Sequence, residues 1–346
     1  MPNIKLCIVG DFLSNKDVDA GGPFRDGRGK MFKTWLRQSG IEPRECLFLN
    51  VFNQVPPGRF HPNSFCGPKD EGLPQVKFFK RGKYVKAEYA SEIARVRAQI
   101  NAANPNLILL CGDFAAWALL EGHHAIETSR GRIMQANHTI ESRKALLTYS
   151  PSQILASWKL RPTLLADLDK AKREQEFADI RRPHRRIHLP ESIEDLESFY
   201  NEYLTAAPKL SCDIETKDLM ITCVGFSGDE KDALVIPFYS YAQSDGNFWR
   251  TKREEYLAWV FVRRMLTLPH QLSFGQNFQY DMQYFLKEMG IKSTNFGDDT
   301  MLLHHVLQPE MKKGLGFLAS IYTDETAWKS MHKTSYKDKT TKKEDT

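Results

Sequence analysis

Three absences limit the class of this chain. No apolar run in its 346 residues is long enough to cross a membrane, and the N-terminus has no secretory signal pattern. The six cysteines include no Cys-x-x-Cys pair, which disfavours a zinc site, and several lie within apolar strand-like runs. We therefore expect reduced, buried thiols in a cytoplasmic protein without a membrane partner.

Length and charge set wider limits. A chain of 346 residues is long enough for two domains, each with its own hydrophobic core. The formal net charge of +5 permits a nucleic-acid partner but does not by itself indicate one. The function therefore has to be inferred from motifs rather than from composition.

A pair of acidic residues marks the middle of the chain. Within the run Ser211–Thr216, Asp213 and Glu215 lie two residues apart, so on a strand both side chains project from one face. Two carboxylates held close together repel each other, and a divalent cation relieves that repulsion. Oxygen ligands suit Mg²⁺ or Mn²⁺ better than Zn²⁺. An Asp-x-Glu pair on its own is more often a solvated strand surface.

A later run, Phe274–Asp281, strengthens the metal hypothesis. Asn277 and Asp281 lie four residues apart and would share one face of a helix, and Gly275 before them would let that helix begin sharply. The predicted buried stripe of this helix consists of Phe278, Met282 and Phe285.

The two runs resemble the motifs of the DEDD 3′–5′ exonucleases, in the form that proofreads in family A DNA polymerases. Asp213–Thr216 is similar to the first motif, and Asn277, Tyr280 and Asp281 are similar to the second. Three further stretches fit the family: 220–227 and 233–241 as the hairpin after the first motif, and 298–303 as the next helix start.

The resemblance implies two-metal hydrolysis of a 3′-terminal phosphodiester in single-stranded DNA. The implied ligands of Mg²⁺ or Mn²⁺ are Asp213, Glu215 and Asp281, with Asn277 and Tyr280 at the substrate. The family's last motif, Tyr-x-x-x-Asp on a C-terminal helix, is not found in this chain. We therefore expect weak or no exonuclease activity from the chain alone, and a separate polymerase polypeptide could supply the missing Tyr and Asp.

The first half of the chain alternates between predicted strands and helices. Strands are predicted at 4–10, 45–51 and 105–111, and a further strand ends in a turn within 146–152. Helices are predicted at 29–39, 87–101 and 162–176, and another follows Gly112 and Asp113 and runs through Leu120. Parallel-sheet proteins place ligands at the carboxyl ends of such strands, where Asn50 lies. This order predicts a three-layer α/β/α domain.

That order resembles the uracil-DNA glycosylase superfamily, in particular its family 4, over about residues 4–175. Asp11 lies where the family has the Glu of its active-site loop. Phe24 matches the aromatic residue that stacks on the extruded base, and Asn50 matches the residue that hydrogen-bonds the pyrimidine edge. Ser150 stands where the family normally has a histidine.

Two departures weaken the implied glycosylase chemistry. Asp11 has a shorter side chain than Glu but could still orient a water, whereas the hydroxyl of Ser150 cannot match the proton-transfer capacity of imidazole. No iron–sulfur cluster is expected, because the cysteine ligands of family 4 are absent. We favour a degenerate domain that binds DNA or a base, or only supports the architecture. An active uracil or modified-base glycosylase and a non-catalytic DNA-binding module of a phage replisome are the alternatives.

The resemblances predict a glycosylase-like domain (1–178), a basic linker (179–188), an RNase H-like α/β exonuclease domain (189–328) and a polar tail (329–346). This arrangement resembles the N-terminal portion of phage family A DNA polymerases, without a polymerase domain. Residues 77–86, in which aromatic side chains are interleaved with lysines, are a candidate nucleic-acid surface.

Overall fold

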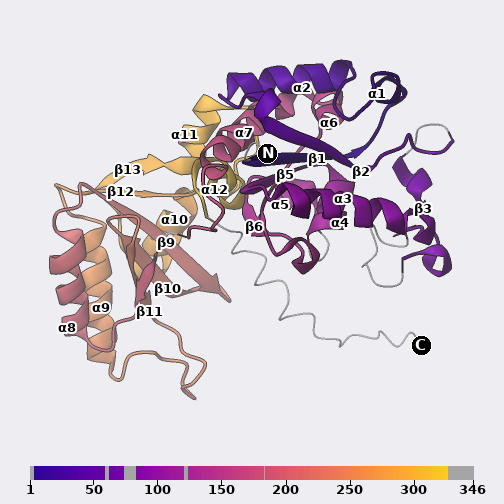
Figure 1. Ribbon diagram of the computed structural model, residues 1–346. Helices are drawn as coiled ribbons and strands as arrows, with labels where there is room; N and C mark the ends of the chain where they lie inside the picture. The colour runs from indigo at the N-terminus through magenta and orange to yellow at the C-terminus, as the bar shows by residue number, and fades with distance from the viewer. Residues whose placement is uncertain (1–3, 59–61, 74–82, 121–123, 183, 326–346) are drawn as a thin grey trace, which may run out of the picture. The chain divides into compact units, whose positions relative to one another are not determined.

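The structure, a computed structural model, describes residues 4–58, 62–73, 83–120, 124–182 and 184–325. The predicted polar tail and most of the candidate surface at 77–86 lie outside these residues. The chain divides into two compact units (Figure 1). The first contains Met1–Arg182 and the segment from Gly316 onward, and the second is Pro183–Leu315. Within the described ranges, no helix has the length and apolar character needed to cross a membrane.

A five-stranded sheet forms the centre of the first unit. Its order is β2 (Cys46–Phe52), β1 (Leu6–Phe12), β5 (Leu107–Cys111), β7 (Lys144–Thr148) and β6 (Ile133–Gln135). The first four strands are parallel, and β6 runs antiparallel to β7. A parallel sheet is covered on both faces, and β5 and β7 are accordingly buried along their whole length. A separate short hairpin consists of β3 (Cys66–Gly67) and β4 (Tyr84–Val85).

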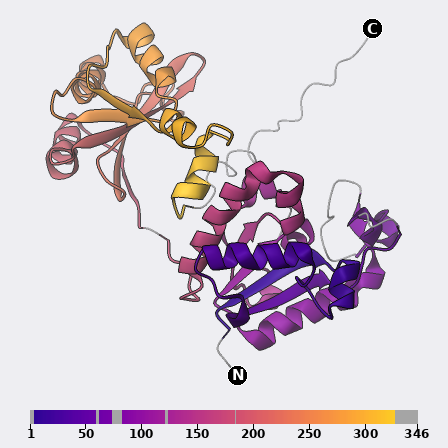
Figure 2. The ribbon, with the colours of Figure 1, turned by 90° about the horizontal axis from the view of Figure 1, so that it is seen from above.

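Helices cover both faces of this sheet and give the three layers that the sequence predicts (Figure 1). One face carries α2 (Gly27–Gln38), α6 (Pro151–Ala156) and α7 (Arg161–Glu174), and the other carries α3 (Ala90–Ala103) and α4 (Asp113–Leu119). Two short helices complete the main part of the unit, α1 (Asn15–Asp19) and α5 (Ile126–Ser129). In the view from above, α2 lies over the strands (Figure 2).

The predicted elements of the first unit are present with small shifts in their bounds. The helix predicted at 29–39 is α2, and Gly40 follows it in the left-handed region with φ of 74°. On this helix Phe32 and Leu36 are fully buried, whereas Met31 is 37% exposed.

None of the six cysteines forms a disulfide. Cys7, Cys111 and Cys212 are buried, and the other three are half-buried. Burial raises the pKa of the Cys7 thiol above its ordinary range, so this thiol stays protonated and unreactive.

The second unit is built on a six-stranded mixed sheet. Its order is β13 (Phe296–Asp299), β12 (Leu272–Gly275), β9 (Lys209–Lys217), β10 (Met220–Ser227), β11 (Asp232–Pro237) and β8 (Arg186–His188). Strands β9, β10 and β11 form an antiparallel meander, and β8, β12 and β13 run parallel to their neighbours. The strands predicted at 220–227 and 233–241 are β10 and β11, although β11 ends at Pro237.

One hydrophobic core lies between this sheet and its helices. The helices are α8 (Ile193–Phe199) with a π-helical turn at Tyr200–Leu204, α9 (Lys252–Met265), α10 (Gln279–Met289) and α11 (Thr300–Leu307). The sheet contributes alternate residues of three strands: Leu210, Cys212, Ile214, Val224, Phe226, Leu234 and Ile236. A capping box formed by Ser192 and Asp195 begins α8.

Part of the predicted basic linker is folded. Arg186–His188 forms β8 and pairs with β11. Asp232 accepts two hydrogen bonds from the Arg186 guanidinium, at 2.7 and 2.8 Å, and lies 2.8 Å from His188 Nε2. The connection between the units is therefore shorter than 179–188, because Arg186 is committed to an ion pair within the second unit.

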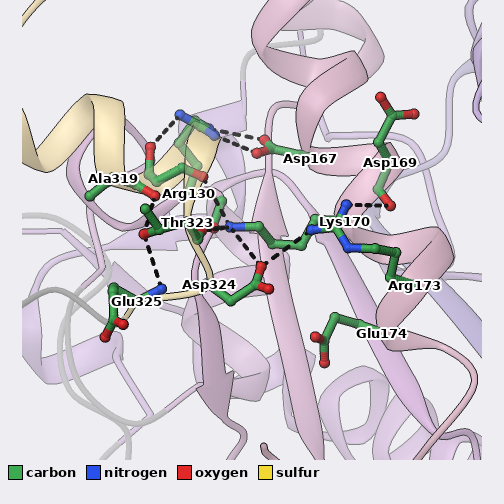
Figure 3. Close-up of polar contacts among 12 residues, drawn as sticks. Arg130, Asp167, Asp169, Lys170, Arg173, Glu174, Ala319, Thr323, Asp324 and Glu325 are labelled. Atoms are coloured by element: carbon green, nitrogen blue, oxygen red, sulfur yellow. Dashed lines mark hydrogen bonds and ion pairs between the residues drawn. The ribbon is translucent and has the colours of Figure 1, made fainter. Parts of the chain in front are cut away.

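Helix α12 (Leu315–Tyr322) does not pack with the unit in which the sequence placed it. The sequence placed it in the exonuclease domain (189–328), but the segment from Gly316 onward belongs to the first unit. Lys170 donates to the carbonyl oxygens of Ser320 (3.1 Å) and Thr323 (2.8 Å) at the end of this helix. Figure 3 shows Lys170 pointing toward the segment that carries Thr323 and Asp324. A cation is favourable there because the last helical carbonyls carry a partial negative charge.

A buried ion pair supports the same segment. Arg130 donates to Ser320 Oγ at 3.0 Å and makes two hydrogen bonds to the Asp167 carboxylate. Asp167 also accepts from Thr148 Oγ1 at 2.7 Å. Arg130 and Asp167 are 2% and 0% exposed, so each charge depends on the other for compensation.

We predict that Asp167→Asn lowers the unfolding free energy of the first unit by about 3–5 kcal/mol, because it leaves Arg130 as an uncompensated buried charge. The matched control is Asp169→Asn, an exposed position on the same helix, which should change stability by no more than about 0.5 kcal/mol. Urea denaturation of both variants measures the difference. Equal stability of the two variants would contradict the prediction.

Candidate functional site

Strand β9 presents two acidic residues on the accessible face of the second sheet. Leu210, Cys212 and Ile214 are buried, whereas Asp213 and Glu215 between and after them are exposed. This is the two-residue alternation that the sequence predicts for the first motif. Both carboxylates therefore lie on one face, near the middle of the sheet. We call the face of β9, β10 and β11 that carries them the open face.

The neighbouring strand leaves room beside these carboxylates. In the antiparallel register, Gly225 lies opposite Asp213 and Cys223 lies opposite Glu215. Directly opposed residues share a face, and Gly225 has no side chain to cover the Asp213 carboxylate. The open face can therefore admit a ligand at Asp213.

Asp281 adds a third carboxylate from the first turn of α10. Its side chain is 3% exposed, and its Oδ1 accepts a hydrogen bond from the Ile214 amide at 3.0 Å. Burial and the negative charge of Asp213 raise the pKa of Asp281 to about 7, against the opposing effect of the Ile214 amide. Asp213 and Asp281 thus lie close enough to repel each other.

The chemistry of these side chains fits a hard divalent cation. Three carboxylates supply only oxygen donors, which Mg²⁺ and Mn²⁺ prefer, and a cation would relieve the repulsion between Asp213 and Asp281. In the part of the chain that the structure describes, no three His, Cys, Asp or Glu side chains are grouped closely enough to hold a metal ion. Of the three predicted ligands, the structure brings Asp213 and Asp281 near each other. Glu215 lies on the same face of β9 as Asp213.

Asn277 is not on the helix where the sequence placed it. Helix α10 begins at Gln279, and Asn277 precedes it with φ of 57°. The backbone amide of Asn277 donates to Asp299 Oδ1 at 3.0 Å, which holds this turn in the left-handed region. Asn277 and Asp281 therefore do not share a helical face.

Gly275 is required for a different reason from the one predicted. It ends strand β12, and a Cβ there would stand 2.7 Å from the Phe278 ring and 3.0 Å from the Cys212 carbonyl oxygen. The glycine permits close approach of the strand to its neighbours rather than a sharp helix start. Phe278 and Phe285 are fully buried, as predicted for the apolar stripe.

Tyr280 joins α10 to the end of β9. Its hydroxyl lies 2.9 Å from Thr216 Oγ1, and its ring centroid lies 4.9 Å from that of Tyr284. Tyr280 remains 43% exposed. The side chain therefore fixes the first turn of α10 and still offers an accessible ring.

Asp299 is a site residue that the sequence indicated only as a helix start. Its carboxylate accepts the backbone amides of Asn277, Phe278, Met301 and Leu302. It caps α11 and also holds the turn before α10. With four donors already bound, Asp299 is a positioning residue for Asp281 rather than a further ligand. The available signal was an Asp immediately before a helix, the ordinary pattern of an N-cap.

In the first unit, the four residues predicted for a base pocket meet in one cavity. The cavity has a volume of about 460 Å³, and its lining includes Asp11, Phe24, Asn50 and Ser150. These residues come from β1, β2, the loop before α2 and the start of α6. The cavity lies at the carboxyl ends of parallel strands, the usual ligand position in such sheets.

A glycine allows two of these residues to approach β1. A Cβ at Gly10 would stand 2.5 Å from Asn50 Oδ1 and 2.9 Å from the Phe24 ring. Phe24 is 7% exposed and packs on Phe32 and Phe48, with ring centroids 5.6 and 5.3 Å away. Its ring therefore belongs to the core and to the cavity wall together.

Asn50 is the most notable polar residue of this cavity. It is 3% exposed, and among the described residues its side-chain amide has no hydrogen-bond partner. Asn50 is not among the described side chains with a fully buried, unpaired N or O atom, so its amide atoms reach the space of the cavity, where water or a ligand can pair with them.

Asp11 and Ser150 are engaged as helix caps. Asp11 Oδ1 accepts the amides of Phe114 (2.9 Å) and Ala115 (3.0 Å) at the start of α4. Ser150 caps α6 in a capping box with Gln153, with hydrogen bonds of 3.3 and 2.8 Å. These contacts explain both residues by folding alone, so the roles predicted from the resemblance gain no support from them.

Three charged residues of the cavity wall were missed by the sequence reasoning. Asp17 accepts the backbone amides of Arg25 and Asp26, at 2.7 and 2.9 Å. Asp26 caps α2 and accepts from Arg28 Nε at 2.7 Å, while Arg28 Nη1 donates to Ser152 Oγ at 3.0 Å. Burial alone would raise the pKa of Asp26, but its hydrogen bonds hold the pKa below the ordinary value.

Comparison with family models covers both units. The model described as the uracil DNA glycosylase superfamily matches residues 1–178, just over half of the chain. The chain belongs to the uracil-DNA glycosylase superfamily. A second model, described as a 3′-5′ exonuclease, matches residues 187–345, so this superfamily member carries a fused DEDD 3′–5′ exonuclease family domain. The predicted fold class, two α/β domains with the second RNase H-like, is confirmed.

Several solved structures have some similarity to this superfamily member. The RNase D of Escherichia coli, an exoribonuclease, is 18% identical with a TM-score of 0.33, over 43% of this chain and 36% of that one. The EXO domain of Aedes aegypti Nibbler is 14% identical (TM-score 0.32; 45% of this chain and 77% of that one). The catalytic core of Trypanosoma brucei RRP6 is 14% identical (TM-score 0.34; 46% and 41%). The chain thus spans about a third of the length of RNase D. No curated protein matches it.

The cavity of the glycosylase-superfamily unit generates a pH prediction. Burial, followed by the charge of Asp113, raises the pKa of Asp11 from 3.8 to about 7, against the helix amides that lower it. A carboxyl whose pKa is raised by folding stabilises the folded state at low pH, and this contribution is lost as the pH rises toward 7.

Asp11→Asn keeps an oxygen acceptor for the α4 amides but cannot ionise. We predict that the unfolding free energy of this variant, relative to the native chain, increases between about pH 4 and pH 7 and is constant above that range. Denaturant titrations across this range measure the difference, with exposed Asp19→Asn as the control. A pH-independent difference would refute the assignment.

Proposed function

We propose that the exonuclease unit removes nucleotides from the 3′ ends of single-stranded DNA. The supporting observation is that the buried Asp281 carboxylate is bonded to β9 beside Asp213, on the strand that also carries Glu215. These three residues would hold Mg²⁺ or Mn²⁺. The bound ions would prepare the attacking water and stabilise the leaving 3′ oxygen.

Neighbouring residues position these acids, and their surroundings raise the pKa of Asp281. The Ile214 amide fixes Asp281, and the Tyr280 hydroxyl joins the same helix to β9 through Thr216. With a pKa of about 7, Asp281 is partly protonated near neutral pH. Asp281 would have to be ionised to hold a cation, because a carboxyl group is a metal ligand only in its deprotonated form.

The proposal extends to the setting of the enzyme. The pairing of a glycosylase-superfamily unit with a proofreading-type exonuclease unit resembles the N-terminal portion of a phage family A DNA polymerase. In this proposal polymerase polypeptide outside these 346 residues supplies the Tyr-x-x-x-Asp motif, so these residues alone have weak hydrolytic activity.

Digestion of a 5′-labelled single strand with Mn²⁺ tests the hydrolysis. We expect a weak ladder of 3′-shortened products. Asp213→Ala should reduce the cleavage rate by more than roughly 100-fold, because loss of a group that only supports a metal ligand already costs roughly 10- to 100-fold. The control is Asp298→Asn, a carboxylate of the same unit that pairs with Lys209. Persistence of the ladder in Asp213→Ala would exclude this site.

Metal binding gives a readout that does not depend on hydrolysis. Titration of Mn²⁺ followed by electron paramagnetic resonance should show weaker binding to Asp281→Asn than to the native chain, with Asp298→Asn unchanged. Equal Mn²⁺ affinity in all three proteins would remove Asp281 from the ligand set.

We propose a second function for the glycosylase-superfamily unit, the binding of an extruded nucleobase. The unpartnered amide of Asn50, 3% exposed within a cavity of about 460 Å³, favours it. The Phe24 ring lines the same cavity and could stack on the base. Because Ser150 replaces an imidazole and is engaged in capping α6, we expect base binding without efficient bond cleavage.

Binding of a uracil-containing single strand to Asn50→Ala tests this second function. Loss of a hydrogen bond to a buried amide should weaken affinity by roughly 5- to 150-fold. Asn53→Ala, an exposed position on the same segment, serves as the control. Release of free uracil by the native chain would favour the active-glycosylase alternative, and unchanged affinity in Asn50→Ala would contradict a base pocket.

A further inference from the structure

Two tyrosines and a lysine extend the open face beyond the carboxylates. Alternation along β9 places Lys217 on the same face as Asp213 and Glu215. The ammonium of Lys217 lies 5.1 Å from the ring centroid of Tyr239 and 4.6 Å from that of Tyr241. The two rings meet edge to face, with centroids 4.9 Å apart. We call these three residues the tyrosine cluster.

The tyrosine cluster is not part of the hydrophobic core. Phe238 is buried and stacks on Trp259 of α9, with ring centroids 3.7 Å apart. The backbone bends at Phe238, where the amides of Phe238 and Tyr239 both donate to the Thr222 carbonyl oxygen, at 2.8 and 3.1 Å, so the side of Tyr239 is read from its contacts. The contact with Lys217 confirms that this side is the open face.

Tyr241 is exposed but held in place. It is 80% exposed, while Lys217 lies over its ring and Tyr239 packs against it. These contacts restrict the orientation of the ring, which lowers the entropy lost when a ligand stacks on it. An ordered aromatic ring in water contributes little to folding of this unit, so a ligand is the better explanation of the arrangement.

The position of the cluster identifies the kind of ligand. Lys217 is two residues from Glu215, about 7 Å along a strand. A nucleic-acid strand whose 3′ end reaches the carboxylates and that runs along β9 toward Lys217 would pass over the tyrosine cluster with its next nucleotides. Unpaired bases stack on aromatic rings without regard to sequence, and a lysine offsets the charge of the phosphates near the acidic site.

We propose that Lys217, Tyr239 and Tyr241 form a stacking platform for an unpaired base of the strand whose 3′ end occupies the carboxylate site. This inference rests on the exonuclease function proposed above. It assigns a single-stranded ligand in particular, because bases within a duplex are already stacked on each other.

Fluorescence anisotropy of a 5′-labelled oligo(dT) with the full chain, in EDTA so that cleavage does not occur, tests the platform. Tyr241→Ala should weaken binding by roughly 5- to 150-fold, the loss expected for one base–aromatic stack. Tyr241→Phe keeps the ring and should bind within about twofold of the native chain. The matched control is Tyr256→Ala, which removes a 66% exposed tyrosine from α9.

Salt dependence tests the role of the lysine. Lys217→Ala should reduce the slope of log affinity against log salt by about 0.7, the value for one phosphate contact in a single strand. A blunt duplex of the same length should not distinguish Tyr241→Ala from the native chain. Sensitivity of duplex binding to Tyr241→Ala would contradict a stacking platform.

The outcomes separate this inference from the function on which it rests. Native affinity in Tyr241→Ala, together with a ladder that requires Asp213, would overturn the platform and leave the exonuclease proposal in place. Weakened binding in Tyr241→Ala without Asp213-dependent cleavage would support the platform and overturn the hydrolysis. Equal losses in Tyr241→Ala and Tyr256→Ala would also overturn the platform.

Discussion

The hydrogen bond from the Ile214 amide to the Asp281 carboxylate is the constraint on which the exonuclease site depends. It bonds α10 to β9 at the one residue between Asp213 and Glu215, so the strand that carries two acids also fixes the third. A displacement of α10 along the strand would separate the acids. Asp299 limits that displacement, because it holds the backbone immediately before α10.

In the first unit, the polar side chains of the cavity differ in whether their hydrogen bonds are already made within the protein. Asp11, Asp17 and Asp26 accept backbone amides near the starts of helices, so their charges support the cavity wall. Asn50 is as deeply buried but has no such partner among the described residues. The same cavity therefore contains polar groups whose role is folding and one whose hydrogen-bonding capacity remains for a ligand.

The sequence was most informative where structure depends on local pattern. The alternation of β9 followed from apolar and polar periodicity, which also placed both acids of the first motif on one face. The bounds of β10 agree with the strand that the family resemblance implied. It failed where a remote partner decides the conformation. The left-handed turn at Asn277 is held by Asp299 from another strand, and the capping of α4 by Asp11 joins residues far apart in the chain. Contacts between residues far apart in the chain leave no trace in the apolar and polar periodicity of the sequence.

The attachment of α12 to the first unit has a consequence for biosynthesis. Domains generally fold as they leave the ribosome, the N-terminal one first. Here Arg130 and Lys170 emerge early, but Ser320 and Thr323, which accept their hydrogen bonds, are made only after the whole exonuclease unit. The first unit therefore begins to fold first and is completed last, with two incompletely satisfied buried cations during the interval.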